Sequence, residues 1–473
     1  MSCKQLIVSL VSLLPFAAMS QPLPDEAVVD LAIVSARIYP LVRSGEGCHA
    51  EVEVCNAGDA AVYAVSVTVQ CGEMVFEGVH DEPLDPDSTA VIGVECLLVT
   101  TDALANMALP VTATTADGRP DVTPSDNVAT LMTNVYTDGA GFDVPRGVLM
   151  EQFSTELCSN CPARDRLADR VLADYSCPIV RVTHHTAFHY DRFTVGYSEE
   201  IYPFFYNSPY VYAPAVMLGR KHYDGMLDSH GGYSPGPVFR LSETNLRRAL
   251  DDQAAMPNFV SMRINTTVDE AAGELRINVS GRDLLVTSGQ VINVFITEDG
   301  IRSDSQAGSD TTWTHNHVLR EVLTPVWGAP LDVGEDGNYS FDAVWEIKDE
   351  ITGPHATTPV NLANINVVAF IGNHDAADPN RCEVFNAAVA DKVFSSSTGI
   401  GDAAVNASVT VDGRSIMVRG DYDTARIYGI GGVLVAELRG MGGDDMTTEL
   451  NPGLYIIQIL ADDKPCVQKV IVR

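Results

Sequence analysis

The sequence has few basic residues, and no apolar run after its first twenty residues is long enough to span a membrane as a helix. Lysine and arginine number 30 against 63 aspartates and glutamates, and no Lys/Arg-rich block offsets this excess. Nucleic acid is a polyanion, so it would repel a chain with this charge balance. We therefore expect no nucleic-acid partner and no transmembrane segment.

The motifs of several enzyme classes are also missing. The sequence has no phosphate-binding loop and no serine in a nucleophile elbow, so nucleotide-binding and hydrolase functions have no support. It has a single Cys-x-x-Cys pair, Cys158 and Cys161. A structural zinc site would need a second ligand pair at matched spacing. Zinc is therefore a weak interpretation of the two cysteines.

The N-terminus has the pattern of a secretory signal. One lysine precedes an apolar stretch from Leu6 to Met19, which serine and proline interrupt and which is too short to span a bilayer. We expect a signal peptide over residues 1–20 and export of the remaining chain. Loss of Cys3 with this segment leaves nine of the ten cysteines, so in an oxidising compartment at least one thiol stays unpaired within the chain.

Residues 27–137 show short alternating strands separated by turn residues, with no convincing helix. This pattern predicts an immunoglobulin-like β-sandwich. Cys71 and Cys96 fall in strands that could be neighbours, so we expect a disulfide between them. Cys48 and Cys55 should lie on opposite faces of one strand, because side chains alternate along a regular pleat.

Residues 143–257 have a different pattern. "RGVLMEQF" predicts a buried strand, the segment after Cys161 has apolar residues at helical spacing, and "PIVRVTHH" predicts a second strand. A later helix should begin after Ser242 as N-cap and end before Pro257. Strand, helix and strand in this order predict a βαβ unit in a mixed sheet.

Strand patterns return over residues 258–394, where we expect a β-rich sandwich with a central strand at "QVINVFITEDG". A linker follows at 395–403, and a compact β-sandwich is predicted over 404–473. The predicted fold is multidomain and mostly β, with immunoglobulin-like β-sandwiches flanking one α/β thioredoxin-like domain.

The cysteine pair beside a βαβ unit indicates redox chemistry. If Cys158 lies at the helix N-terminus, free backbone N–H groups and the helix dipole stabilise its thiolate, and Cys161, one turn further in, can resolve a mixed disulfide. The pair resembles the site of thioredoxin-like proteins. That resemblance implies a cis-proline opposite the cysteines, for which Pro214 in "VYAPAVMLGR" is the candidate.

The site departs from the usual thioredoxin pattern. Leu157 stands where an aromatic residue is usual, the intervening residues are Ser159 and Asn160, and proline follows the second cysteine instead of preceding it. No charged residue or histidine lies between the cysteines, so the thiolate would depend mainly on the helix end. A purely structural disulfide therefore stays open as the alternative to a catalytic one.

Histidines raise a metal hypothesis without a ligand set to support it. His184, His185 and His189 cluster after the second strand, and His315 and His317 flank one asparagine. A local histidine cluster without a carboxylate partner is commonly polar surface. We expect no metal and no cofactor, although His184 and His185 could lie near the disulfide, where a cation would favour the thiolate.

Five segments together resemble the outer membrane protein 28 family: "MEQFSTELCSNCPARDRLAD", "APAVMLGR", "VFITEDGI", "HNHVLREVLTPVWG" and "NVVAFIGNHD". The likeness covers about residues 146–393 and implies a thioredoxin-like domain followed by a β-rich domain. It also implies a protein secreted through the periplasm, or located on the outer-membrane surface, of a Gram-negative bacterium. Residues 27–137 resemble the cell-adhesion-related immunoglobulin-like modules of bacterial surface proteins.

The C-terminus resembles the type A sorting domain of type IX secretion cargo. Its marks are Gly432 in "GGVLV", Gly453 and Tyr455 in "LNPGLYIIQI", and Lys469 in "QKVIVR". The resemblance implies the type IX secretion machinery as a partner, and attachment to surface lipopolysaccharide.

Two functions follow from these patterns. The first is thiol-disulfide exchange on protein or peptide disulfides, in which Cys158 attacks, Cys161 resolves and Pro214 shapes the peptide groove. The second is a non-catalytic surface binding or adhesion protein in which the disulfide only closes a helix start, because β-sandwiches are a common extracellular recognition format.

Overall fold

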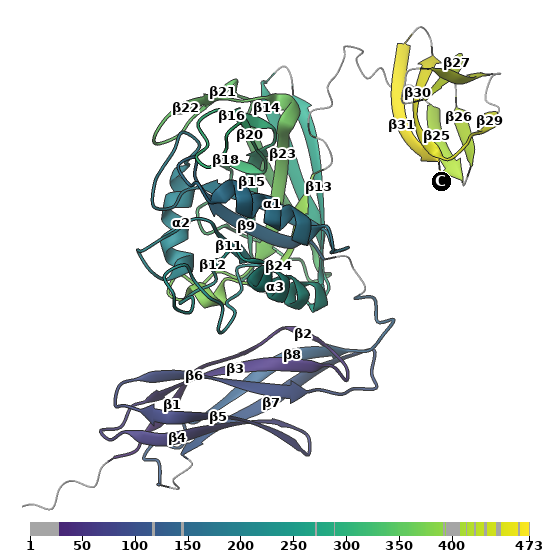
Figure 1. Cartoon of the computed structure of the whole chain (residues 1–473). Coiled ribbons are helices and arrows are strands. Elements are labelled where there is room, and N and C mark those ends of the chain that lie inside the picture. Colours follow the sequence, from purple (N-terminus) through teal and green to yellow (C-terminus); the bar gives the residue numbers. More distant parts are fainter. Residues whose placement is uncertain are drawn as a thin grey trace, which may run out of the picture.

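The computed structural model of the chain describes residues 28–115, 119–142, 146–269, 272–287, 289–390, 393, 407–412, 414–420, 422–429, 433–440, 446–461 and 464–472. The predicted signal peptide, the predicted linker and Gly432 lie outside the described residues. Figure 1 shows N-terminal strands in purple and blue, a larger mixed group of helices and strands in teal and green, and C-terminal strands in yellow.

The N-terminal part is a sandwich of two sheets. Across the first sheet the strands are β1 (Leu31–Ile38), β3 (Gly47–Asn56) and β6 (Thr89–Leu97); across the second they are β2 (Leu41–Arg43), β8 (Val128–Tyr136), β7 (Leu104–Thr115), β4 (Val62–Cys71) and β5 (Met74–Leu84). Alternate residues of β3, such as Val52 and Val54, are buried between the sheets. One apolar core therefore holds both sheets together.

The predicted disulfide between Cys71 and Cys96 is wrong, and both thiols are free. Cys71 ends β4 and Cys96 lies on β6, so the two residues belong to different sheets. The cross-strand partner of Cys96 is Cys48 on β3. Cys48 lies on the inward-facing register of β3 and Cys55 on the outward one, in accord with the pleat. Burial raises the pKa of Cys48 to about 12 and that of Cys96 to about 11, so neither thiol ionises readily.

The thioredoxin-like part begins with a parallel strand pair. Its elements in chain order are β9 (Val148–Ser154), α1 (Cys161–Leu172), β10 (Ile179–His185), α2 (Gly196–Tyr206), β11 (Ala215–Leu218), β12 (Phe239–Arg240) and α3 (Glu243–Ala255). β9 and β10 are parallel, and β11 is antiparallel to β9. α1 and α3 pack on one face of this sheet, and α2 packs on the other. The Ser242 hydroxyl accepts from Asn245 N (3.3 Å), so the predicted N-cap of α3 is confirmed.

The next elements in the chain include strands that continue this sheet and strands that form smaller sheets. These are β13 (Val260–Asp269), β14 (Glu274–Asp283), β15 (Val291–Glu298), β16 (Ile301–Ser303), β17 (Trp313–His315), β18 (Val318–Val322), β19 (Ala329–Pro330), β20 (Asn338–Glu346), β21 (Glu350–Thr352), β22 (Thr357–Pro359), η1 (Leu362–Asn364), β23 (Ile365–Gly372), η2 (Pro379–Arg381) and β24 (Val384–Val389). The order across the large sheet is β12-β11-β9-β10-β18-β15-β23-β24, with β19 also on β15. Its two halves join through one residue pair, Thr183 with Val318.

A second sheet, β13-β14-β20, packs against the large sheet and encloses a second core. Ile292, Val294 and Ile296 of β15 face this core, whereas Phe295 faces α2. A strand covered on both faces reads as a continuous apolar run, which is why "QVINVFITEDG" predicts a central strand. The prediction of a central strand at this place is confirmed. Whether residues 143–257 and 258–394 fold independently stays a prediction.

The C-terminal part has its own core. Its strands are β25 (Ala407–Asp412), β26 (Ser415–Gly420), β27 (Thr424–Gly429), β28 (Leu434–Arg439), β29 (Met446–Glu449), β30 (Gly453–Ala461) and β31 (Lys464–Val472). They form the sheets β25-β26-β29 and β28-β27-β30-β31. Ile416, Ile427, Ile457 and Ile459 are buried between them.

The chain is a multidomain, mostly β protein, as predicted. Tyr39 connects the N-terminal sandwich to the large sheet, because its hydroxyl donates to Pro257 O (3.3 Å) and its ring meets Phe259 and Phe385 edge to face. Within the described ranges, no helix combines the length and apolarity needed to cross a membrane.

Candidate thiol-disulfide site

The cysteine pair forms a disulfide at the start of α1. The Cys158–Cys161 bond has an S–S length of 2.16 Å and a Cα–Cα distance of 5.4 Å. A turn after β9 carries Cys158, and Cys161 N donates to Cys158 O (3.3 Å). The helix begins at Cys161 with Asn160 as N-cap, so the expectation that the helix begins at Cys158 is wrong. Pro162 explains this start, because proline is favoured in the first turn, where N–H groups have no helical acceptor.

Pro214 lies at the same end of the sheet as the disulfide. The Ala213–Pro214 peptide bond is cis. Pro214 directly precedes β11, and Ala215 at the start of β11 pairs with Phe153 near the end of β9. The strand register thus places Pro214 beside the segment that leads from β9 to Cys158. The role of Pro214 in a peptide groove stays a prediction.

A loop from the β-rich part covers the disulfide. Cys158 is 2 % exposed and Cys161 is 3 % exposed. The covering loop, residues 304–312, connects β16 to β17. Ala307 N donates to Glu156 O (2.7 Å), and the Gln306 side-chain amide donates to Cys158 O (3.0 Å). These bonds hold the loop against the turn that carries the cysteines.

Gly308 makes the closest approach of the covering loop. Its φ is +76°, and a Cβ at this position would lie 1.9 Å from Ser159 O. No residue with a side chain fits such a contact without moving the loop. The backbone of the covering loop therefore lies directly on Ser159, the first of the two residues between the cysteines.

Side chains at both ends of the covering loop add to the contact. Glu156 is buried and accepts a hydrogen bond from Ser303 at the end of β16 and another from Arg192 (2.9 Å). On the other side, the Arg166 guanidinium of α1 lies 5.2 Å from the ring centroid of Trp313, where β17 begins. The loop is thus anchored by a buried carboxylate at one end and a cation–π contact at the other.

A small cavity of about 20 Å³ remains beside Cys161 under the covering loop. A cavity of this size has room for about one water molecule. Its lining residues are Gln152, Ser154, Cys161, Pro162, Asp165, Thr183, Gln306, Trp313, His315 and Asn316. The cavity is too small for a peptide, so a protein substrate could reach the disulfide only after the covering loop moves.

The opposite face of β9 and β10 buries a charged network. Glu151 receives two hydrogen bonds from Arg220 (both 2.8 Å), and Arg220 also donates to Tyr197 (2.8 Å). Burial raises the pKa of Glu151, but the charge and hydrogen bonds of Arg220 outweigh it and lower the pKa to about 2. His184 joins this network, with Nε2 3.3 Å from Glu151 and Nδ1 2.9 Å from Ser198. Burial lowers the pKa of His184, so it stays neutral.

The three histidines near the second strand do not gather at one point. His184 faces α2, His189 is exposed, and His185 lies on the face of α1. The partner of His185 is His315 on β17, with ring centroids 4.8 Å apart and an interplanar angle of 71°. The sequence does not reveal this pair, because the two residues are far apart in the chain and the residues around each give no sign of the contact.

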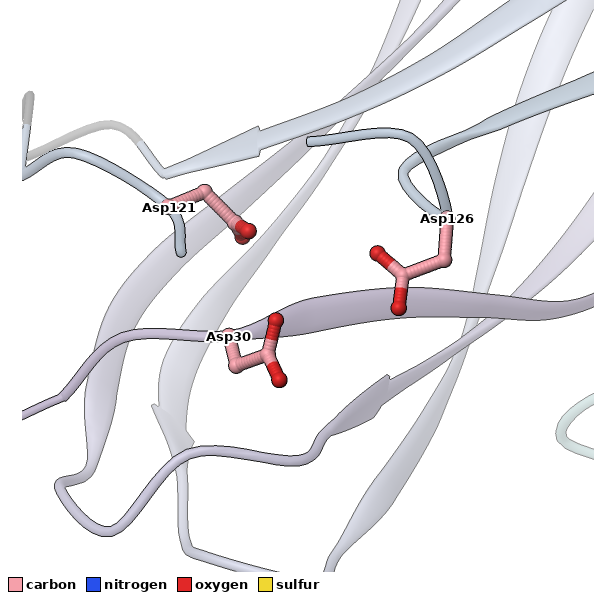
Figure 2. A group of neighbouring side chains, drawn as sticks. All are labelled: Asp30, Asp121 and Asp126. Atoms are coloured by element: carbon pink, nitrogen blue, oxygen red, sulfur yellow. The ribbon is translucent and has the colours of Figure 1, made fainter. Parts of the chain in front are cut away.

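A group of three aspartates lies in the N-terminal sandwich. Asp30, Asp121 and Asp126 each place one carboxylate oxygen within 4.8 Å of the others, and Figure 2 shows the three side chains pointing toward a common space. Asp121 also accepts from Leu31 N (2.7 Å). The sequence does not reveal this group, because its three residues come from separate positions in the chain. Acidic side chains often gather in this way without an ion, so we assign the group no role.

Comparisons with known proteins do not assign this chain to a family. No protein-family model and no curated protein matches the chain. Among solved structures, HBP35 of Porphyromonas gingivalis is similar over 70% of this chain and 99% of its own, at 16% identity and a TM-score of 0.41. The CARDB domain of the PF1109 protein from Pyrococcus furiosus, solved in complex with di-metal ions, covers 24% of this chain and 98% of its own at 18% identity and a TM-score of 0.20. At these values neither similarity carries a functional argument, and the description of the site rests on the geometry of this chain.

Proposed function

We propose that this chain is an exported surface protein that performs thiol-disulfide exchange through Cys158 and Cys161. The observation that carries the proposal is the Cys158–Cys161 disulfide at the first turn of α1, directly after a strand of a mixed sheet. Unpaired N–H groups at a helix N-terminus favour an anion, so they stabilise the thiolate that exchange requires.

In the proposed reaction, the reduced protein presents Cys158 as the nucleophile. Its thiolate attacks a substrate disulfide, forms a mixed disulfide and releases one substrate thiolate. Cys161 then attacks the Cys158 sulfur, restores the protein disulfide and releases the second substrate thiolate. Pro214, at the same end of the sheet, is proposed to line the groove for the substrate peptide.

The covering loop makes this a gated site. Both sulfurs are buried beneath residues 304–312, so exchange requires the loop to lift from the turn at Ser159. The loop contacts that must break are one backbone hydrogen bond, the Gln306 amide bonds and the contacts of Glu156 and Trp313. A loop held by a few such contacts can open locally without unfolding the sheet beneath it.

Location and export belong to the same proposal. The likeness of residues 146–393 to the outer membrane protein 28 family, and that of the C-terminus to type A sorting domains, support secretion through the periplasm of a Gram-negative bacterium. The likeness of the C-terminus alone supports the type IX secretion machinery as a partner and attachment to surface lipopolysaccharide. The substrates would be proteins or peptides with accessible disulfides.

A second candidate function is a surface binding protein in which the disulfide is structural. The observation that favours it is the near-complete burial of both cysteines under the covering loop. In this case the disulfide would only fix the turn that begins α1.

An insulin-reduction assay on the mature chain separates the two functions. We expect the wild type to catalyse reduction and Cys158→Ser to lose at least nine-tenths of that rate. Cys177→Ser is the matched control, because Cys177 is a free, partly buried thiol of the same sheet region and should not affect the rate. Equal rates for the wild type and Cys158→Ser would reject exchange and favour the structural disulfide.

A further inference from the structure

Two buried histidines next to the disulfide each have a ring nitrogen without a partner. His185 is 1 % exposed and His315 is 5 % exposed, and the Nε2 atom of each is buried with no hydrogen bond. An unpaired buried polar atom costs free energy, so a fold that keeps two of them side by side needs a reason. The proposed exchange through the cysteine pair supplies one.

Asp191 fixes the tautomer of His185. Asp191 Oδ2 lies 2.7 Å from His185 Nδ1. Burial raises the pKa of Asp191, but the interaction with His185 and the hydrogen bonds from the backbone N–H groups of Glu156 and Phe193 outweigh it, so the pKa is lowered and the carboxylate stays ionised. A carboxylate only accepts hydrogen bonds, so His185 Nδ1 carries the proton and Nε2 keeps a free lone pair. The lone pair of His185 lies beside the ring of His315.

His315 contacts the ring of His185 and lies at the same small cavity as the resolving cysteine. Its side chain lines the small cavity that Cys161 also lines. The carboxylate of Asp165 lines the cavity too, but it is bound to Arg181 (2.9 Å) and is partly exposed. Gln152, Ser154 and Thr183, which complete this side of the cavity, do not titrate near neutral pH. His315 is thus the one neutral base on the described wall of the cavity that has no charged partner.

The groups around His315 lower its pKa while the loop is closed, so His315 can accept a proton only when the loop is open. Burial and the neighbouring His185, followed by Arg192, lower the pKa of His315, while Asp191 raises it, and the result is about 3. The imidazole is therefore neutral under the closed loop. Opening the loop admits water and removes part of the burial effect, so the pKa of His315 moves back toward its ordinary value. The Asp191 carboxylate, which raises the pKa of His315, then favours a proton on it.

We propose that His315 accepts the proton of the Cys161 thiol when Cys161 resolves the mixed disulfide. The inference rests on the proposed function and assigns one step of it. The Cys161 S–H bond breaks, its proton passes to the imidazole directly or through one water, and its electron pair forms the Cys158–Cys161 bond. The bond between Cys158 and the substrate sulfur breaks, and that sulfur leaves as a thiolate, which takes a proton from solvent. His315 later returns its proton to solvent.

The arrangement follows the general design of an activated nucleophile. A thiol is followed by a base, and the base is oriented and stabilised by a further group, here His185 with Asp191. His315 comes from β17, at the base of the hairpin whose tip is the covering loop. Its pairing partner Ile301 lies at the far end of that hairpin from the loop. The covering loop can therefore lift while His315 keeps its contact with His185.

The test separates formation of the mixed disulfide from its resolution. The reduced full chain reacts with dithiobis(nitrobenzoate), which forms a mixed disulfide at Cys158, and acid-quenched samples are analysed by mass spectrometry of the Cys158 peptide. Wild type, His315→Gln and His185→Gln are compared from pH 6 to pH 9. His189→Gln is the matched control, because His189 is exposed and outside the pair.

We expect His315→Gln to slow the decay of the mixed disulfide at least tenfold at pH 7 and to leave its formation unchanged within about twofold. The deficit should shrink as pH rises, because Cys161 then ionises without a base. His185→Gln should show a smaller deficit with the same pH dependence. Decay rates in His315→Gln equal to the wild type at every pH would overturn the inference and leave the proposed function standing.

Two further outcomes are decisive. Formation and decay slowed by one common factor at all pH values would mean that the substitution disturbs the fold, and would also overturn the inference. A wild-type mixed disulfide that never decays to the Cys158–Cys161 disulfide would instead reject the proposed function itself.

Discussion

The two faces of the strand pair β9–β10 bury polar groups in opposite states. On the α2 face, Glu151 and Arg220 are joined by two hydrogen bonds, and His184 is bound to Ser198 while its Nε2 lies 3.3 Å from Glu151 without a hydrogen bond. On the α1 face, His185 and His315 keep unpaired nitrogens beside a disulfide and a small cavity. The neighbouring residues His184 and His185 thus belong to different environments because they alternate across one strand.

The same sheet thus has one face whose charges are paired and another face whose polar groups are free to react. A buried ion pair has no capacity left for chemistry, and the fold depends on it because removal of one partner leaves the other charge buried alone. Unpaired groups reduce stability, yet they are free to accept a proton or to meet a substrate.

Arg220→Met should strongly lower the free energy of unfolding. The substitution leaves the Glu151 carboxylate buried without its cation, and removal of one partner from a buried pair costs about 3–5 kcal/mol of unfolding free energy. Arg247→Met is the matched control, because Arg247 pairs with Asp174 and Glu243 at the surface, where ion pairs contribute little, and its loss should be much smaller. Chemical denaturation at pH 7 measures both, and similar losses in the two variants would contradict the contrast.

The same face should make stability depend on acid. The pKa of Glu151 is about 2 in the folded chain, below its ordinary value of 4.5, so its contribution is present above pH 4.5 and is lost as pH falls toward 2. The loss is on the order of 3 kcal/mol. Glu151→Gln should flatten the stability curve over this window, as followed by denaturation at successive pH values. Parallel curves for the two proteins would show that Glu151 does not titrate there.

Gly308→Ala should expose the Cys158–Cys161 disulfide on the α1 face. The new Cβ would meet Ser159 O, and φ at this residue is positive, so the covering loop must move away from the disulfide. We expect reduction of Cys158–Cys161 by dithiothreitol to become about tenfold faster, as measured by alkylation of the released thiols. Gly273→Ala is the control, with a φ of +68° and nothing within 4 Å of its Cβ. Unchanged reduction kinetics in Gly308→Ala would mean that the loop is no barrier.

Arg166→Gln should have the smallest effect. It removes the cation that lies over Trp313 and leaves the rest of the covering loop intact. An exposed cation–π contact contributes about 0.5–1 kcal/mol, which corresponds to a two- to fivefold faster reduction of the disulfide. Arg170→Gln on the same helix, whose side chain donates only to Arg166 O, should leave the rate unchanged. A rate equal to the wild type in Arg166→Gln would remove Trp313 from the anchors of the loop.

Local patterns were sufficient for much of the fold. The apolar runs at β9, β10 and β15 and the N-cap at Ser242 are consecutive-residue signals, and the structure has them where the sequence predicts them. The Cys158–Cys161 disulfide also follows from local spacing. The start of α1 could be predicted only from the preference of proline for the first helical turn, because Pro162 places that start at the second cysteine.

The covering loop could not be predicted in the same way. Its contacts with the cysteine turn go mainly through the backbone of Ala307 and Gly308, and a backbone contact leaves no side-chain signature in the sequence. The His185–His315 pair and the single junction at Thr183 and Val318 likewise depend on how distant strands align. The wrong pairing of Cys71 with Cys96 has the same cause, since the sheet to which each strand belongs is a tertiary property.

The separation of the covering loop from the cysteines along the chain has a consequence for the order of events during synthesis. Gln306, which binds Cys158 O, lies 148 residues after that cysteine. A chain emerges from the ribosome N-terminus first, so the cysteines are made well before the segment that later hides them. For that interval the pair is open to any oxidant of its compartment, and the disulfide can form before the loop arrives. The redox state in which the cysteines are first enclosed thus depends on what the nascent chain meets before the loop arrives.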